Sequence, residues 1–179
     1  QTAAPEGLSD VIFIAGGDTH SIALKSNGEL IVWGYDGMGQ ATVPVGLSAT
    51  AAVAAGISHT LALKCDGTVR AWGGNEYGQA KVPEGLSDVT AISAAGDHSA
   101  ALRSNGTVVA WGEGDDGQST VPEGLTGVLA IAAGGYHTLA LKNDSTVIGW
   151  GYNESGQASA PEDLSGVIAI AAGGFHSLA

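Results

Sequence analysis

The hydrophobic positions of this chain form short runs, and glycine, asparagine, aspartate and proline separate them. One stretch shows the order clearly: an Ala- and Ile-rich run from Val89 to Ala94, a run that begins at His98, and a third run, TVVAWG, at 107–112. Short runs bounded by turn residues are typical of β-strands. No stretch combines a helical period with capping residues. The pattern therefore predicts an all-β protein.

The middle run is apolar on both faces of its predicted strand. In HTLALK at 59–64, Leu61 and Leu63 share a face with His59, and Ala62 lies on the opposite face. A sheet with one face in solvent would alternate apolar and polar residues. This run therefore predicts a sheet that lies between two similar sheets.

Tight turns are predicted between the second and third runs. The turn residues are Asn27-Gly28, Asp66-Gly67, Asn105-Gly106 and, in the fourth copy, Asp144-Ser145. Such pairs favour type I′ hairpins, in which both residues have a positive φ, so we expect antiparallel pairing. A serine in a left-handed conformation is strained, and we expect a weaker turn at Ser145.

The order of runs repeats with a fixed period. Successive histidines are 39 residues apart (59−20), as are the tryptophans, the prolines and the glutamines that begin at Gln1. Such a period predicts a repeat architecture in which each unit covers the next. We expect a single domain over 1–179, with units at about 7–45, 46–84, 85–123 and 124–162 and a partial unit at 163–179.

Antiparallel units of this length, covered on both faces, predict the blades of a β-propeller. A β-solenoid would have shorter rungs and parallel strands. Four blades are complete, and the fifth has only its first two runs, at 167–172 and 175–179. Three arrangements stay open: a piece of a longer propeller, a five-bladed ring that lacks one strand, or homo-oligomerisation through open blade edges.

The motif AAGxxHTLALKxDGTVxAWGxNxxGQ resembles the repeat of the regulator of chromosome condensation family. Its most characteristic positions are Asp66, Gly67, Trp72, Gly73, Gly78 and Gln79. The continuation VPxGLSxVxAIAAG is similar to bacterial members, which include a β-lactamase inhibitor protein. The resemblance implies a propeller, usually with seven antiparallel blades, and it implies no single function. On the style of the repeat we expect a bacterial protein that is extracellular or periplasmic.

Composition narrows the classes of partner. The chain has 6 Lys and Arg against 18 Asp and Glu, which gives a formal net charge of −12. Such a surface repels phosphate backbones, so we expect no nucleic-acid partner. No apolar run approaches the roughly 20 residues that span a bilayer, so we expect no membrane partner. Cys65 is the single cysteine, and we expect an exposed thiol without a catalytic role.

Two patterns suggest chemistry, and neither predicts catalysis. The repeated histidines should lie about 10 Å apart on neighbouring sheets, too far to share a metal ion. We expect each to be half-buried and bonded to a backbone carbonyl. Asp97-His98-Ser99 contains the residue types of a hydrolase triad. Adjacent strand residues point to opposite faces, so the three cannot act as a triad. We expect no enzymatic activity, no metal and no cofactor.

Two segments vary strongly between units that otherwise hardly differ. The first is the residue before each histidine, and the second is the loop after each Trp-Gly pair, at 35–38, 74–77, 113–116 and 152–155. Loops on a rigid scaffold concentrate recognition residues. In a ring we expect both segments on one rim, where aromatic side chains provide contact area and acids provide steering.

The sequence thus predicts a non-catalytic scaffold that binds another protein through this rim. The candidate binding residues are Tyr35, Met38, Tyr77, Asp97, Asp115, Asp116, Tyr136, Tyr152 and Phe175. Three other interpretations stay open: an architectural, oligomerising segment of a larger surface or secreted protein, an enzyme inhibitor like the bacterial relative, and simple drift at unconstrained loop positions.

Overall fold

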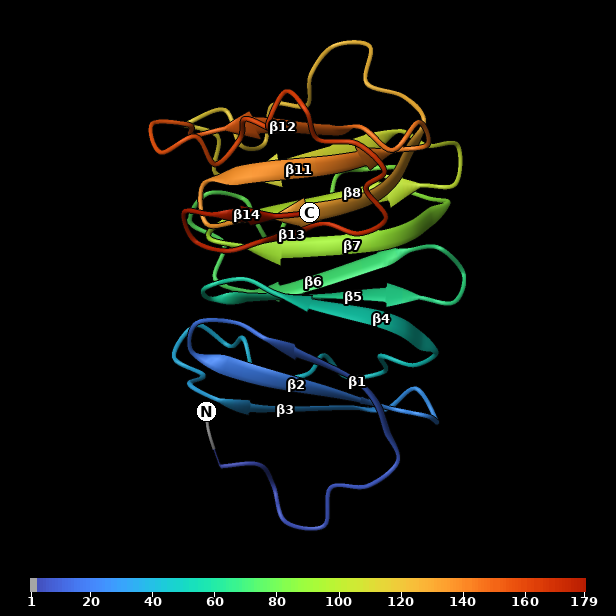
Figure 1. Cartoon of the computed structure of the whole chain (residues 1–179). Helices are drawn as coiled ribbons and strands as arrows, with labels where there is room; N and C mark the ends of the chain where they lie inside the picture. The colour runs from blue at the N-terminus through green and yellow to red at the C-terminus, as the bar shows by residue number, and fades with distance from the viewer. Residues whose placement is uncertain (1–2) are drawn as a thin grey trace.

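A computed structural model describes residues 3–179 and contains strands and turns but no helix in that range (Figure 1). Gln1, the first of the repeating glutamines, lies outside the described residues. The strands are β1 (Val11–Gly16), β2 (His20–Lys25), β3 (Leu30–Gly34), β4 (Thr50–Ala55), β5 (His59–Lys64), β6 (Val69–Gly73), β7 (Val89–Ala95), β8 (His98–Arg103), β9 (Val108–Gly112), β10 (Val128–Ala133), β11 (His137–Lys142), β12 (Val147–Gly151), β13 (Ala171–Ala172) and β14 (Ser177–Leu178).

Each complete unit forms a three-stranded antiparallel meander, with the strand that begins at histidine in the middle. Register is the same in every unit: His59 pairs with Gly73, and His98 pairs with Gly112. The fifth unit is shorter than predicted. Only Ala171–Ala172 and Ser177–Leu178 pair, within the expected runs 167–172 and 175–179. These residues have no third strand beside them among the described residues.

The hairpins between the second and third strands differ from the predicted type. In the first, the Lys25 amide donates to the Glu29 carbonyl and the Gly28 amide donates to the Lys25 carbonyl, both at 2.9 Å. Only Gly28, at φ 80°, is left-handed in this turn. This is a three-residue loop with a type I turn and a glycine bulge, so the type I′ prediction is wrong. The expected left-handed serine is confirmed, because Ser145 has φ 66°.

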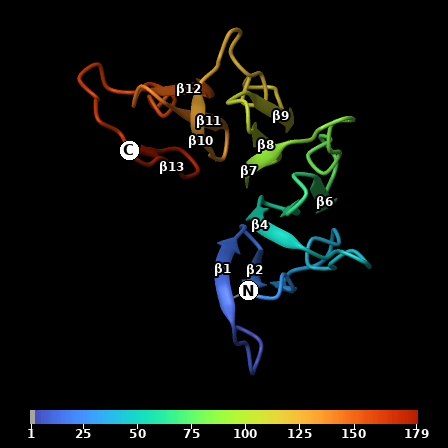
Figure 2. The same ribbon diagram turned by 90° about the vertical axis from the view of Figure 1, so that its right-hand side faces the viewer.

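The sheets stand side by side around an arc (Figure 2). The first strand of each unit lies towards the inside of the arc and the third strand lies towards the outside. The arc is open between β1 and β13, so the chain does not close into a five-bladed ring. Four antiparallel blades and a partial fifth confirm the predicted β-propeller class.

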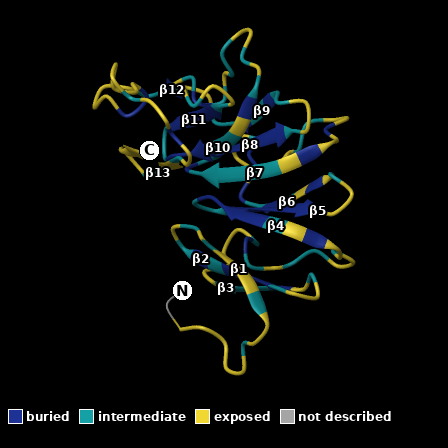
Figure 3. Cartoon of the chain, turned by 45° about the vertical axis from the view of Figure 1, so that its right-hand side comes forward, coloured by how far each residue is buried: buried dark blue, intermediate teal, exposed yellow. Residues whose placement is uncertain are grey.

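The core lies between the sheets, where the middle strands are buried along almost their whole length (Figure 3). Leu61 and Leu63 of β5 pack with Ala101 of the next sheet, and Ala62 packs with Ile22 and Leu24 of the preceding sheet. Large side chains of one sheet thus meet small side chains of its neighbour, and the middle sheets lie between two similar sheets as the sequence predicted. Full burial of one such leucine is worth about 1.5–3 kcal/mol.

A repeated glutamine carbonyl joins each unit to the next. The Gln79 carbonyl accepts from the Trp111 indole N–H at 2.9 Å and from the Ser99 hydroxyl at 2.9 Å. The same pair of bonds recurs at Gln40 and at Gln118. These bonds satisfy a buried carbonyl and hold the crossover segment against the following blade.

Candidate protein-binding site

The repeated histidines are structural. His20, His59, His98 and His137 are fully buried, and each ring bonds through Nε2 to a Thr or Ser hydroxyl of the following unit at 2.8–2.9 Å. The expectation of a half-buried histidine bonded to a backbone carbonyl is wrong on both points. The hydroxyl stands between ring and carbonyl, because it bonds the histidine and also donates to the glutamine carbonyl.

This relay fixes the tautomer of each ring. The Thr138 hydroxyl donates its only proton to the Gln118 carbonyl, so His98 Nε2 must carry the proton that it shares with Thr138. His98 Nδ1 is then an acceptor, and it has no hydrogen-bond partner among the described residues. Burial, together with the neighbouring His137, lowers the pKa of His98 to about 4.

The same geometry excludes nucleophilic catalysis at these pairs. His59 and Ser99 lie 2.9 Å apart, the separation of a nucleophile and its base. Both are fully buried, and Ser99 donates to a carbonyl instead of to the ring. Asp97, His98 and Ser99 do not bond to one another: Asp97 accepts from the Gln79 side-chain amide, His98 bonds to the Thr138 hydroxyl, and Ser99 donates to the Gln79 carbonyl. Residues 3–179 contain no cluster of His, Cys, Asp and Glu that could hold a metal ion.

Each variable loop is anchored by the side chain of the glutamine that follows it. Gln79 Oε1 accepts from the Tyr77 amide at 3.0 Å, and Gln118 Oε1 accepts from the Asp116 amide at 3.1 Å. Gln40 and Gln157 hold the equivalent loops in the same way. These glutamines recur at a fixed spacing in the sequence. Their role in fixing the loops was not predicted, because it depends on the side chain turning back onto the loop.

The two variable segments lie on one rim, as expected. The first loop residue after Trp-Gly donates its amide to the carbonyl of the residue before the histidine: Glu113 to Asp97 at 2.9 Å and Tyr152 to Tyr136 at 2.9 Å. The same bond occurs in the first two units. Side chains from both segments therefore stand next to each other on a single surface, which we call the loop rim.

Four of the candidate residues meet around one pocket of about 140 Å³: Asp116, Tyr136, Tyr152 and Phe175. The Tyr136 and Phe175 rings are stacked with centroids 5.3 Å apart. Tyr152 meets both rings edge-on, at 6.4 Å from Tyr136 and 6.3 Å from Phe175. Three rings from two units thus form one aromatic cluster with a carboxylate beside it.

The remaining candidates lie elsewhere on the loop rim. Tyr35, Met38 and Tyr77 are exposed by 57%, 53% and 50% and are large enough to serve as separate contact points. Asp97 is partly buried and accepts from the Gln79 side-chain amide at 2.8 Å. Asp115 is exposed and does not line the aromatic pocket.

Negative charge collects beside the aromatic cluster. Partial burial raises the pKa of Glu113, and the carboxylates of Asp97, Asp115 and Asp116 raise it further. The Tyr152 hydroxyl donates to Glu154 at 2.7 Å. That bond is the main cause of a raised pKa of Tyr152, to which burial, the charge of Glu154 and the charge of Asp116 also contribute.

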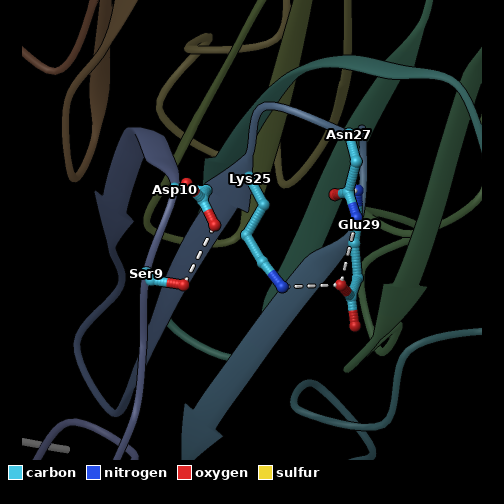
Figure 4. A network of polar contacts seen from close by, with 5 residues as sticks. All are labelled: Ser9, Asp10, Lys25, Asn27 and Glu29. Atoms are coloured by element: carbon cyan, nitrogen blue, oxygen red, sulfur yellow. Dashed lines mark hydrogen bonds and ion pairs between the residues drawn. The ribbon is translucent and has the colours of Figure 1, made fainter.

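The opposite rim, formed by the hairpins, is electrostatically different. Lys25 pairs with Glu29 at 2.9 Å beside a bond from Asn27 to the same carboxylate, and Ser9 donates to Asp10 nearby (Figure 4). Lys64 and Lys142 form equivalent pairs with the acids of their own hairpins. Cys65 is also exposed there, as predicted. In contrast, the loop segments contain no Lys or Arg.

Comparison with solved structures supports the fold. The chain superposes on Prp20p of Saccharomyces cerevisiae with a TM-score of 0.81 and 20% identity, over 96% of this chain and 56% of that one. The ectodomain of the receptor kinase CR4 of Physcomitrella patens gives a TM-score of 0.81 and 28% identity, over 97% and 50%. Human WBSCR16 gives 0.75 and 23%, over 97% and 58%. The chain thus spans 50–58% of the length of these structures.

Radially arranged antiparallel sheets with a loop rim define a β-propeller repeat protein. The model of the regulator of chromosome condensation (RCC1) repeat matches residues 11–40, 51–79, 89–118 and 128–157. This chain belongs to that family, because the matches cover more than half of it. No curated protein is similar enough in sequence to count as a relative. Within residues 3–179 the structure has no helix long and apolar enough to cross a membrane.

Proposed function

We propose that this chain is a non-catalytic scaffold that binds another protein through its loop rim. The observation that carries the proposal is the contrast between a constant buried framework and a variable exposed rim fixed to it. Tyr77 is 50% exposed although its loop is held by Gln79. Exposed aromatic side chains on a rigid backbone lose little entropy on binding, which favours their use as anchors.

The comparisons support a protein partner without naming it. Prp20p of Saccharomyces cerevisiae binds Gsp1p and histones, and a second structure shows the same yeast protein bound to Kap60. The charge of −12 makes a nucleic-acid partner unfavourable for this chain. The burial of His20, His59, His98 and His137, each bonded to a hydroxyl of the next unit, supports a structural role for these side chains.

Site-specific photocrosslinking tests this function. A photoreactive residue at Tyr77 should capture a specific protein, whereas the same residue at Ser104, exposed on the hairpin rim, should not. The purified partner should then bind saturably and lose binding when Tyr77 and Tyr136 are changed to serine. Equal capture from both rims would contradict the proposal, and so would a catalytic activity that disappears on substitution of His98.

A second candidate function is architectural assembly, and one exposed face favours it. Ile14 on β1 is 71% exposed, whereas the equivalent Val53 on β4 is 4% exposed because the preceding sheet covers it. In this candidate the β1 face packs against the open fifth sheet of a second copy. Ile14→Asp should lower the mass measured by sedimentation. The matched control is Ile12→Asp. Ile12 is 65% exposed, and the equivalent residue Leu129, which has a preceding sheet beside it, is still 62% exposed, so a neighbouring sheet does not cover this position.

A further inference from the structure

The aromatic pocket on the loop rim is held in place before any ligand binds. The Asp116 amide is bonded to Gln118, and the Tyr152 amide is bonded to the Tyr136 carbonyl. The Tyr152 ring is oriented by its hydroxyl, which donates to Glu154 at 2.7 Å. Phe175 nevertheless remains 58% exposed. Pre-ordered rings around an open pocket of about 140 Å³ are suited to receive a side chain from outside.

The chemistry of this pocket selects a cation. Its wall consists of three rings and one carboxylate, and it contains no basic group. Aromatic faces attract a cation within about 6 Å of the ring centroid. The Tyr136 and Phe175 rings are stacked on each other, so a cation would lie over an outer face of this pair or over the Tyr152 ring, and not between the stacked rings. Asp97, Glu113 and Asp115 add negative charge next to the pocket.

We propose that the pocket formed by Asp116, Tyr136, Tyr152 and Phe175 binds an arginine side chain of the partner protein. A guanidinium group is planar, so it stacks on a ring and at the same time offers two N–H donors to a carboxylate. It is also more weakly hydrated than an ammonium group, so it loses less on entering an aromatic pocket. A lysine would pair with Asp116 but stack poorly. A trimethylated lysine would contact the rings but could not donate to the carboxylate.

The repeat provides an internal comparison. The equivalent positions one unit earlier are Tyr77, Asp97, Glu113 and Tyr136. Two of these four residues are acidic and only two are aromatic. Only the later junction brings three rings together among the described units. The arginine pocket is therefore a feature of one junction and not of the repeat, as expected for a specificity determinant. This inference rests on the proposed function, because it assigns one contact within that binding surface.

A titration with model peptides tests the assignment without the natural partner. The probes are four capped pentapeptides with arginine, citrulline, lysine or trimethyl-lysine between glycines, added to the full chain labelled with ¹⁵N and ¹³C. We expect the arginine peptide to shift the signals of the four pocket residues saturably, with a dissociation constant on the order of 1 mM. Citrulline has the same shape without charge, and its binding should be about tenfold weaker.

Two variants locate the site. Asp116→Asn should weaken binding of the arginine peptide about fivefold, whereas Asp115→Asn, which removes a charge beside the pocket but none from its wall, should weaken it by no more than about twofold. Both positions are exposed, and an unchanged circular dichroism spectrum verifies the fold of each variant. Tyr152→Leu should weaken binding several-fold through loss of ring contact.

Several results would overturn the assignment. Equal binding of citrulline would show that charge plays no role, and equal or tighter binding of lysine or trimethyl-lysine would exclude selection of guanidinium. Equal effects of the two aspartate variants would mean diffuse attraction by the acidic rim. If the peptide fails but photocrosslinking from Tyr77 still captures a partner, the arginine pocket is wrong and the scaffold function stands. If both fail, the scaffold function is wrong as well.

Discussion

Acid should destabilise this fold through its buried histidines. His59 and His98 are neutral when folded, and burial lowers the pKa of each from 6.5 to about 4. In the unfolded chain both rings return to the ordinary value. Between pH 6.5 and pH 4 the unfolded state therefore binds more protons than the folded state. The stability that these two rings provide is complete above pH 6.5 and is lost as the pH falls to about 4.

The size of this effect follows from the difference in pKa. At about 1.4 kcal/mol for each tenfold change in proton affinity, each of the two histidines accounts for about 3 kcal/mol over the whole window. The structural reason is specific: an added proton would go to Nδ1, which is buried and has no acceptor among the described residues. His20 and His137 also have lowered pKa values, mainly through burial, and act in the same direction.

Urea unfolding followed by tryptophan fluorescence measures the effect, because Trp72, Trp111 and Trp150 are buried. Between pH 8 and pH 4.5, His98→Gln should lose about 2–3 kcal/mol less stability than the parent chain, since its amide does not titrate. Comparing pH slopes cancels the contribution of the carboxylates. His176→Gln is the matched control, because His176 occupies the same repeat position but is exposed. An identical pH slope for His98→Gln and the parent would refute the argument.

Four further substitutions test the framework. Ala49→Gly and Ser145→Gly should each stabilise the chain by about 1 kcal/mol in urea unfolding, because both residues are left-handed, at φ 54° and 66°; a loss of stability in both would contradict this account. Thr138→Val keeps the side-chain shape but leaves buried polar groups unpaired, so thermal and urea unfolding should show a loss of about 1–3 kcal/mol, and an unchanged midpoint would show that the relay is dispensable. Trp111→Phe removes the indole donor to the Gln79 carbonyl and should cost about 2 kcal/mol in urea unfolding; an unchanged midpoint would mean that the Ser99 hydroxyl alone satisfies this carbonyl.

Sequence reasoning predicted the strands well where neighbouring units are present. The middle strands begin at the histidine as expected, because period and turn residues are local signals. The fifth unit was overpredicted: Val167 and Ile168 have strand character but no ladder in the structure. The hairpin type was also missed. Asn-Gly pairs suit both a type I′ turn and a type I turn with a glycine bulge, and only the hydrogen bonds distinguish them.

The site was predicted as a rim but not as a pocket. Alternating strand direction was sufficient to place loops 113–116 and 152–155 with the residues before each histidine. The contact between Tyr136 and Phe175 could not be predicted, because it depends on the angle between two neighbouring sheets. The histidine partner was missed for a similar reason. His98 and Thr138 are 40 residues apart and belong to different sheets, so no local pattern connects them.

The histidine bonds all run in one direction, from each unit to a hydroxyl in the unit that follows. Every junction consequently uses the same parts, and adding or deleting a whole unit recreates each junction without altering any side chain. A gain or loss of any other length would put the wrong residue opposite a buried imidazole. The junctions are therefore compatible with a change in the number of whole units, whereas an insertion or deletion inside a unit breaks them.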